Sequence, residues 1–481
     1  MNQTHSLETR QTTRNCVLYT LVAALLLGCG GYLLFYHLDI RPIALHDEAW
    51  HGINAYEMDQ NNEWIISTYL GEIDYFNLKP PLSMWCIIAG YRLFGYNAFG
   101  LRFYSAFAML LTMTIVTIWL KKRYGSIASL FALALLVGQE LVYAGHSARY
   151  GDADALFILF YTIAMLYMLD SEHDIRRLYG TAICFGLGFM TKSWHAAMIP
   201  FTCLVYLCAS GQIRKLKPHH YILLIICGLL PIAPWAILRI QRDGLAFFIQ
   251  SFETDIQKRM AANNSADPIY HFRTLFNYSG TIIGLCLCAI GTGLCLAKKR
   301  RLVSAGWGLA LWILLPPLLY NFSQFKVYWY IVPILPGLAA AGGIVMDRVC
   351  RYTRRKILCK IFCWIMALGL MIQIGFQFDY VNNLSHTNSF QRTILEKVDR
   401  DVDGGIHVYV KYENGLSNWV DSDRLCVMLA GDGICLDGGE AAFVEDEENA
   451  LLFVNKFHFS YDLLEYYPVV LEYGDNWVLM N

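Results

Sequence analysis

Two adjacent carboxylates stand near the start of the stretch "HDEAWHGINAYEM", residues 46–58, which follows the first long apolar segment. In one interpretation Asp47 caps a helix by accepting backbone N–H bonds, and Glu48 complements the helix dipole. A carboxylate fixed at the start of a helix is also well placed to act as a general base. We predict that Asp47 is this base, and we include its neighbour Glu48 in the candidate catalytic pair.

Three lysines occur in apolar surroundings, where a cation is costly unless it is used or paired. Lys79 lies between an aromatic pair and a diproline in "YFNLKPPLSMW". Lys192, which we expect to be unpaired, lies at a turn between two short apolar segments. Lys326 precedes Tyr330 by four residues, which predicts that both lie on one helix face. A lysine that snorkels to the headgroups, or a belt of aromatic and cationic residues, is the alternative for each.

The stretch "HSARYGDADALF", residues 146–157, brings Arg149, Asp152 and Asp154 to the start of another apolar segment. An ion pair between Arg149 and Asp154 that caps this segment is one interpretation, and a role in the reaction is the other. The Asp152–Asp154 spacing also occurs in nucleotide-sugar transferases, but nucleotide sugars are not supplied on the face of the membrane that we infer below. We expect Arg149 to bind the donor, both aspartates to position substrate, and none of these residues to ligate a metal.

The elements that must position these residues are membrane spans. The chain has 481 residues, of which 56% are hydrophobic and 16% charged, with a mean hydropathy of +0.37. Its apolar residues form unbroken runs whose length is close to the roughly 20 residues needed to cross a bilayer, which predicts a polytopic membrane protein. The net charge of −1 gives no global field that would favour nucleic acid.

Eleven spans are predicted: 17–36, 99–120, 126–145, 153–170, 177–190, 194–209, 220–240, 274–296, 303–320, 327–346 and 357–378. With eleven, every cluster of Lys and Arg falls on the side of the N-terminus, as cytoplasmic loops require. The first run is too long for a cleaved signal peptide, so the N-terminus is expected in the cytoplasm. Segment 80–95 is short and contains Arg92, and we interpret it as an interfacial or re-entrant helix in a first outer loop, 38–98.

The chain therefore divides into a transmembrane region, 1–384, and a tail, 385–481, with soluble character. Short alternating stretches such as GIHVYV and PVVLEY, separated by Gly and Asp, predict a small α/β domain outside the membrane. The fold class is mainly α, with candidate site residues at the outer edge of the spans. Lysines opposite carboxylates suit a reaction with an anionic lipid leaving group and an acceptor that loses a proton.

The order of these residues resembles the polyprenyl-phosphate-sugar-dependent glycosyltransferases of the GT-C fold. This group includes the aminoarabinose transferases of lipid A and, more distantly, the protein O-mannosyltransferases. The matching residues are Asp47-Glu48-Ala49, Met58, Trp64, Lys79-Pro80-Pro81-Leu82, Leu93-Phe94-Gly95, Asn97, Phe99, Arg102, Ser105-Ala106, Arg149, Asp154-Ala155, Thr191-Lys192, Lys326, Tyr330, Pro333 and Pro336. They cover the membrane region to about residue 343, and the tail resembles no family we can name.

The resemblance implies a multi-span enzyme of the cell (inner) membrane, with its site and its C-terminal domain on the extracytoplasmic face. Asp47 would be the base in an inverting transfer from a polyprenyl-phosphate-linked sugar to a lipid, glycan or protein acceptor. Lysines at the positions of Lys79 and Lys192 would hold the carrier phosphate, and Lys326 and Tyr330 would line the same pocket. Membrane lipids are the other expected partner, and nucleic acid is not one.

One departure concerns a metal cofactor. The lipid A enzymes have a glutamate immediately before the KPP lysine, and it binds a metal together with a histidine from a later outer loop. Here Leu78 takes the place of the glutamate, and His271 is out of register with the histidine. The resemblance therefore leaves a divalent metal open. Two other functions also remain open: a transporter or flippase of lipid-linked saccharides, and a non-catalytic partner in envelope assembly.

Overall fold

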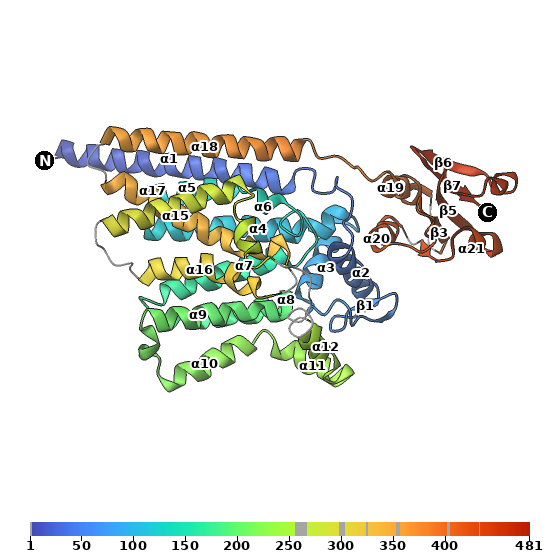
Figure 1. Ribbon diagram of the computed structural model, residues 1–481, viewed down its shortest axis with the longest axis horizontal. Coiled ribbons are helices and arrows are strands. Elements are labelled where there is room, and N and C mark those ends of the chain that lie inside the picture. Colours follow the sequence, from blue (N-terminus) through green and yellow to red (C-terminus); the bar gives the residue numbers. More distant parts are fainter. Residues whose placement is uncertain are drawn as a thin grey trace.

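The structure, a computed structural model, describes residues 2–254, 267–297, 304–323, 326–352, 356–401, 405–431 and 433–481. Long helices run side by side in a bundle, and a small sheet with its own helices lies beyond one end of that bundle (Figure 1). The bundle helices are α1 (Asn2–Phe35), α4 (Ala98–Arg123), α5 (Ser126–Val137), α7 (Asp154–Asp170), α8 (Arg177–Lys192), α9 (Met198–Ala209), α10 (Pro218–Leu229), α15 (Ser279–Ala297), α16 (Ser304–Asn321), α17 (Leu335–Tyr352) and α18 (Lys356–Asn382).

Within the described residues, four helical stretches are long and apolar enough to cross a membrane: Arg14–Phe35, Ala98–Arg123, Tyr328–Arg351 and Lys360–Asn382. A fifth candidate is a bent pair, α10 and α11 (Ala233–Asp243), whose axes meet at 58°. The span predicted at 220–240 is therefore bent, and its crossing of the membrane stays a prediction. Pro231 and Pro234 explain the break, because proline removes a backbone donor and clashes with the preceding turn. The number of eleven spans stays a prediction.

Other predicted spans are interrupted near the site. The run 126–145 forms α5 and the single turn α6 (Glu140–Tyr143), and the run 194–209 begins with the 3-10 turn η1 (Ser193–Ala197) before α9. The run 327–346 likewise begins with a 3-10 helix, η4 (Tyr328–Ile334), that leads into α17. Each interruption lies at the end of the bundle that faces the first loop (Figure 1). Irregular backbone is thus concentrated where functional side chains are expected.

The first loop contains α2 (Asp47–Gln60), the short strands β1 (Thr68–Tyr69) and β2 (Glu72–Ile73), and α3 (Leu82–Phe94). Helix α3 has 13 residues, so it is about 20 Å long, against a hydrocarbon core of about 30 Å. It packs tightly on α4: a Cβ at Gly90 would lie 2.1 Å from the backbone oxygen of Gly100. The predicted helix in segment 80–95 is confirmed, while its place at the membrane surface stays a prediction.

The C-terminal region is α/β, as the sequence predicted. A five-stranded sheet has the order β4-β3-β5-β7-β6, in which β3 pairs in parallel with β4 and β5, and β7 pairs antiparallel with β5 and β6. Its elements are α19 (Ser389–Asp401), β3 (His407–Lys411), α20 (Asp421–Ala430), β4 (Ile434–Cys435), α21 (Gly439–Glu445), β5 (Ala450–Asn455), η5 (Tyr461–Glu465), β6 (Val469–Tyr473) and β7 (Asn476–Met480).

Strand β5 is apolar on both faces because each face of the sheet is covered. Leu451 and Phe453 belong to a cluster that also includes Ile53 of α2 and Leu425 of α20, whereas Leu452 faces a second, smaller cluster. The first of these cores therefore joins the sheet to the first loop. A division at residue 385 stays a prediction: the smaller core lies wholly within the tail, whereas the larger one is shared with the first loop.

Candidate active site

Asp152 is the centre of the polar cluster between the first loop and the bundle. Its side chain is 1% exposed, and one oxygen lies 2.6 Å from Nδ1 of His146. The other oxygen lies 3.7 Å from Nδ1 of His51 and 4.0 Å from Nζ of Lys79. Burial alone would raise the pKa of Asp152, but the charge of Lys79 and the hydrogen bond from His146 lower it, so the carboxylate is ionised.

Asp47 reaches the same cluster from α2. It is the first residue of the helix, the N-cap is His46, and no side chain caps the helix, so the interpretation of Asp47 as a cap is wrong. Its carboxylate instead lies 3.7 Å from Nζ of Lys79 and 3.8 Å from Nδ1 of His146, and 46% of its side chain is exposed. The charge of Lys79 is the main cause that lowers the pKa of Asp47. Asp47 is thus an ionised carboxylate that solvent or an acceptor can reach.

His51 has a defined protonation state in this environment. Its Nε2 lies 3.1 Å from Nζ of Lys79, and an ammonium group only donates, so Nε2 must accept and the proton must sit on Nδ1. That N–H faces Asp152. Burial, and then the charge of Lys79, lowers the pKa of His51 to about 4, which keeps the ring neutral. His51 therefore holds the Lys79 ammonium between the two aspartates.

The environment of His146, in contrast, favours the charged form of its ring. Burial disfavours its charged form, but the hydrogen bond to Asp152 and the nearby carboxylates outweigh this effect and raise its pKa. Its ring stacks on Trp329, with centroids 3.9 Å apart. His146 is therefore a second candidate cation beside Asp47. Sequence reasoning passed over His51 and His146, although His51 follows Asp47 by four residues and so shares its helix face.

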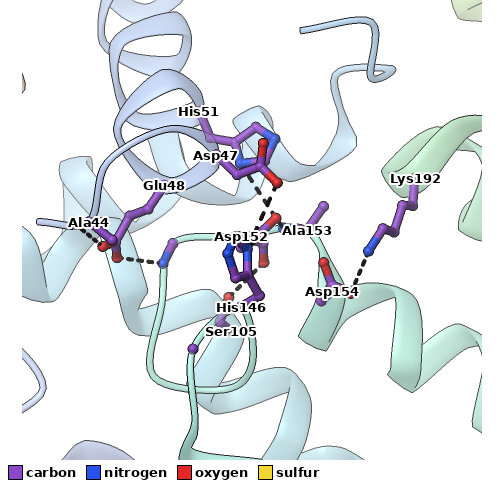
Figure 2. Close-up of polar contacts among 12 residues, drawn as sticks. Ala44, Asp47, Glu48, His51, Ser105, His146, Asp152, Ala153, Asp154 and Lys192 are labelled. Atoms are coloured by element: carbon purple, nitrogen blue, oxygen red, sulfur yellow. Dashed lines mark hydrogen bonds and ion pairs between the residues drawn. The ribbon is translucent and has the colours of Figure 1, made fainter. Parts of the chain in front are cut away.

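Lys192 and Asp154 form a buried ion pair beside this cluster (Figure 2). Asp154 is the first residue of α7 and Lys192 the last of α8, so the pair joins two helix ends. The expectation that Lys192 is unpaired is wrong, and so is the alternative pair of Arg149 with Asp154. The ammonium of Lys192 also lies 5.5 Å from the ring centre of Tyr330. A cation at this distance from an aromatic ring is attracted to it, which brings Tyr330 into the site.

Lys326 lies away from these contacts. Its Nζ donates to the backbone oxygen of Asp267. Val327 is extended and Tyr328 begins a 3-10 helix, so the prediction that Lys326 and Tyr330 share a helix face is wrong. The segment reaches the site instead through Trp329 on His146 and Tyr330 on Lys192.

Glu48 points away from Asp47 (Figure 2). Its two oxygens accept from Nε and Nη2 of Arg102 at 2.7 and 3.0 Å. They also accept from the backbone N–H groups of Ala44 and Gly151. Glu48 is 2% exposed, and this geometry supports a positioning role rather than the catalytic role included above. It ties the loop before α2 to the loop that carries Asp152.

Arg149 is also structural in its contacts. Its guanidinium donates to the backbone oxygens of Leu33, Leu34, Tyr36 and His37, at the C-terminal end of α1. Leu33 and Leu34 lie in the last turn of the helix, where carbonyls lack a partner within the helix, and Arg149 supplies one. The residue is 2% exposed. Its contacts therefore do not support the predicted binding of donor.

Backbone strain is present at three positions that border the site. His46, His146 and Ser193 have φ of 67°, 58° and 52°. Residues other than glycine rarely adopt this region. His46 precedes Asp47, His146 is the partner of Asp152, and Ser193 follows Lys192. Strain of this kind persists where the surrounding structure holds it, and it is concentrated at functional sites.

The metal pair implied by the resemblance does not fit this chain. Leu78 has no ligand atom and is buried in the core, and Nδ1 of His271 lies 3.3 Å from Oδ1 of Asn321. Asp47, His146 and Asp152 offer ligand atoms within 4.8 Å of one another. The ammonium of Lys79 already lies within 4.0 Å of both aspartates. We therefore assign no step to a metal.

Comparisons with known proteins agree with this arrangement. Residues 78–238 match the family described as dolichyl-phosphate-mannose-protein mannosyltransferase. The undecaprenyl phosphate-alpha-4-amino-4-deoxy-L-arabinose arabinosyl transferase 2 of Pseudomonas fluorescens is 28% identical over 69% of this chain and 58% of its own length. The corresponding transferase of Aeromonas hydrophila is 28% identical over 64% of this chain and 57% of its own length. The chain thus spans less than two thirds of these curated relatives.

Solved structures show the fold. The crystal structure of ArnT from Cupriavidus metallidurans bound to undecaprenyl phosphate aligns with a TM-score of 0.72 at 16% identity, over 97% of this chain and 98% of that one. The Archaeoglobus fulgidus oligosaccharyltransferase in the apo form aligns with a TM-score of 0.51 at 10% identity, over 86% of this chain and 64% of that one. The GT-C-like fold predicted from the sequence is confirmed, and the chain resembles the glycosyltransferases that use polyprenyl-phosphate sugars.

Proposed function

We propose that this chain is a membrane glycosyltransferase that moves a sugar from a polyprenyl-phosphate carrier to an acceptor hydroxyl. The observation that carries the proposal is the contact between a half-exposed, ionised Asp47 and the ammonium of Lys79. Such a pair supplies a proton acceptor and a cation within one small space. The likeness to transferases whose names include undecaprenyl phosphate supports the same reaction class.

The mechanism that we propose is a single inverting displacement. Asp47 takes the proton of the acceptor hydroxyl as its oxygen attacks the anomeric carbon. The bond between that carbon and the phosphate oxygen breaks, and its electrons leave with the polyprenyl phosphate. The leaving group needs compensation of negative charge rather than a proton. Lys79, whose side chain is 16% exposed, is the lysine placed to contact it.

The remaining residues prepare this geometry. The charge of Lys192 is compensated by Asp154 and its ammonium lies near the ring of Tyr330, so we expect it to contribute less to phosphate binding than Lys79. Glu48 holds the loop that leads into α2. We place the N-terminus in the cytoplasm and the site and C-terminal region on the extracytoplasmic side of the cell membrane, as the basic clusters predict.

A transporter of lipid-linked saccharides is less well supported. It requires charged groups within the spans or broken helices in two related halves. Here Asp154 and Lys192 lie at helix ends, and Asp47 and Lys79 lie in the first loop. No contact among the described residues favours a transport path over a reaction site.

The test compares envelope glycans, lipids and glycoproteins by mass spectrometry in a strain that lacks this chain. We expect one sugar modification to disappear, and to return with the wild-type chain but not with Asp47→Asn. Asp39→Asn is the matched control, because Asp39 is an exposed aspartate of the same loop. Full restoration by Asp47→Asn at wild-type protein levels would exclude Asp47 as the base.

A further inference from the structure

A cavity of about 800 Å³ lies between the loop before α2 and the C-terminal region. Ile43 and Leu45 form one wall, and the others include the start of α19, the turn after β3, the start of α20 and the end of β5. Small-molecule sites commonly enclose about 300–1,000 Å³. The cavity is therefore large enough for several sugar residues, and the proposed mechanism does not use it.

Its walls are rich in amide side chains. Asn388, Asn414 and Asn455 line the cavity, and in each the side-chain oxygen accepts a backbone N–H from a residue two positions further along. An amide held by its oxygen keeps two N–H donors for another partner. The hydrogen bonds of the described residues leave these NH₂ groups free to donate. Three such residues along the lining of one cavity suit a ligand with many oxygen acceptors.

The charge of the lining indicates what kind of oxygen ligand fits. Glu413 and Asp423 contribute carboxylates, and no Lys or Arg is among the described residues of the lining. Asp423 is 3% exposed, and its partners include Nε2 of Gln391 at 2.9 Å. Carboxylates accept hydrogen bonds from hydroxyl groups but repel phosphate. The walls therefore favour an uncharged polyol over a phosphorylated ligand.

The cavity is physically joined to the base. Gln391 of α19 accepts from the backbone N–H of Ile43 and donates to its oxygen, at 2.9 and 3.1 Å. Leu45 on the same wall precedes Asp47 by two residues, so their Cα atoms are at most about 7 Å apart. A ligand that fills the cavity thus lies next to the start of α2.

We propose that this junction cavity binds the uncharged, hydroxyl-rich part of a glycan acceptor and presents one of its hydroxyl groups to Asp47. The inference rests on the proposed function, because it names the acceptor class of that reaction. The amide donors hold hydroxyl oxygens, Glu413 and Asp423 accept hydrogen bonds from hydroxyl groups, and the donor phosphate stays at Lys79.

Binding to the purified full-length chain tests the proposal without requiring turnover. The probes are arrayed uncharged oligosaccharides, the same oligosaccharides carrying phosphate, and unglycosylated peptides. Thr387→Trp fills the cavity from an exposed position on its rim, and Ser385→Trp adds the same ring at an exposed residue outside the lining. We expect Thr387→Trp to weaken binding of an uncharged oligosaccharide at least tenfold, and Ser385→Trp to change it less than twofold.

A second set of substitutions in the cavity, and a transfer assay on Asp47→Asn, distinguish failure of the cavity proposal from failure of the proposed function. The double change Glu413→Ala and His458→Ala, at two exposed lining residues, should weaken binding at least threefold without a change in Tm. Asp47→Asn should bind the oligosaccharide as the wild type does while it transfers no sugar. Sugar transfer by Asp47→Asn would contradict the role of Asp47 as the base, but it would not contradict the binding of an acceptor in the cavity. The cavity proposal would be overturned if the chain bound peptides or phosphorylated glycans selectively, or if it bound no uncharged glycan. Unaltered binding by Thr387→Trp would also overturn it.

Discussion

One ammonium group organises the protonation of the side chains around it. Lys79 lowers the pKa of Asp47 and Asp152, and it contributes to the low pKa of His51. Two ionised carboxylates and a neutral imidazole therefore surround a single fixed cation. A general base needs its unprotonated form at the working pH, and Lys79 secures that form for Asp47.

The acid limb of the pH profile should report this interaction. Because the pKa of Asp47 is lowered from 3.8, the ionised base is present above that value and is lost as pH falls through the lowered pKa. Lys79→Met removes the main cause, so the acid limb of kcat/KM should move to higher pH. Lys326→Met is the matched control and should leave the limb in place, since Lys326 contacts the backbone of Asp267. An unmoved limb in Lys79→Met would contradict the assignment.

Loss of the Asp47 carboxylate should lower catalysis, whereas loss of the Glu48 carboxylate should lower stability. Asp47→Asn should lower kcat by about 10²- to 10⁴-fold and leave the Tm close to that of the wild type. Glu48→Gln leaves Arg102 as a buried cation without its counter-ion, which costs about 3–5 kcal/mol of folding free energy. Thermal unfolding in detergent and sugar transfer per folded molecule separate the two effects. A stable but inactive Glu48→Gln would restore Glu48 to the catalytic residues.

At the scale of elements, short irregular segments complete the site. The 3-10 helix η4 places consecutive aromatic residues on different partners, Trp329 on His146 and Tyr330 on Lys192. A regular α-helix from Lys326 would have aligned residues four apart instead. The breaks in the bundle thus bring side chains from four separate segments to one place.

Removing the ring of Trp329 should affect transfer through His146. A stacked aromatic pair contributes about 0.5–1.5 kcal/mol beyond its area, so Trp329→Ala should lower kcat/KM by roughly two- to tenfold. Trp329→Phe keeps a ring face for His146 and should recover most of the loss. The two variants are compared at saturating donor, with circular dichroism to check helix content. Equal activity in Trp329→Ala and the wild type would show that the stacking of His146 on Trp329 does not contribute to transfer.

Much of the bundle could be predicted from the sequence, because long apolar runs specify helices by composition alone. The helices α4, α7, α8 and α18 follow the predicted runs closely. The sequence also led to Asp47 and Lys79, whose neighbouring residues carry the resemblance. The partners of Lys192, Arg149 and Glu48 were missed because pairing between distant segments depends on tertiary packing, which no local pattern records. His51 and His146 were missed because their roles arise from neighbours far along the chain.

At the scale of the whole molecule, the C-terminal region and the first loop form one structural unit. Gly52 of α2 approaches α20 so closely that a Cβ there would lie 2.3 Å from Leu425. Leu425 is fully buried in the core that both regions share. Helix α2, which carries the proposed base, is therefore supported by the C-terminal region as well as by the bundle.

A substitution that leaves a cavity in this shared core should lower both the stability of the protein and its kcat. Leu425→Ala should destabilise the protein by about 2–5 kcal/mol, because a buried leucine is replaced by a cavity. It should also lower kcat, although no site residue changes. Leu464→Ala, at an exposed residue of η5, is the control and should leave both quantities unchanged. Loss of Tm without any loss of kcat in Leu425→Ala would show that α2 keeps its position without the C-terminal region.

The paired hydrogen bonds between Gln391 and Ile43 have a consequence for building chimeras. The backbone that leads to the base is held by a side chain 348 residues later in the chain. A C-terminal region exchanged for that of a relative would bring its own residue to this position and shift the base with it. Under the proposed function, acceptor choice and catalytic competence should therefore be exchanged together, and engineering one should require transplanting the loop before α2 along with the tail.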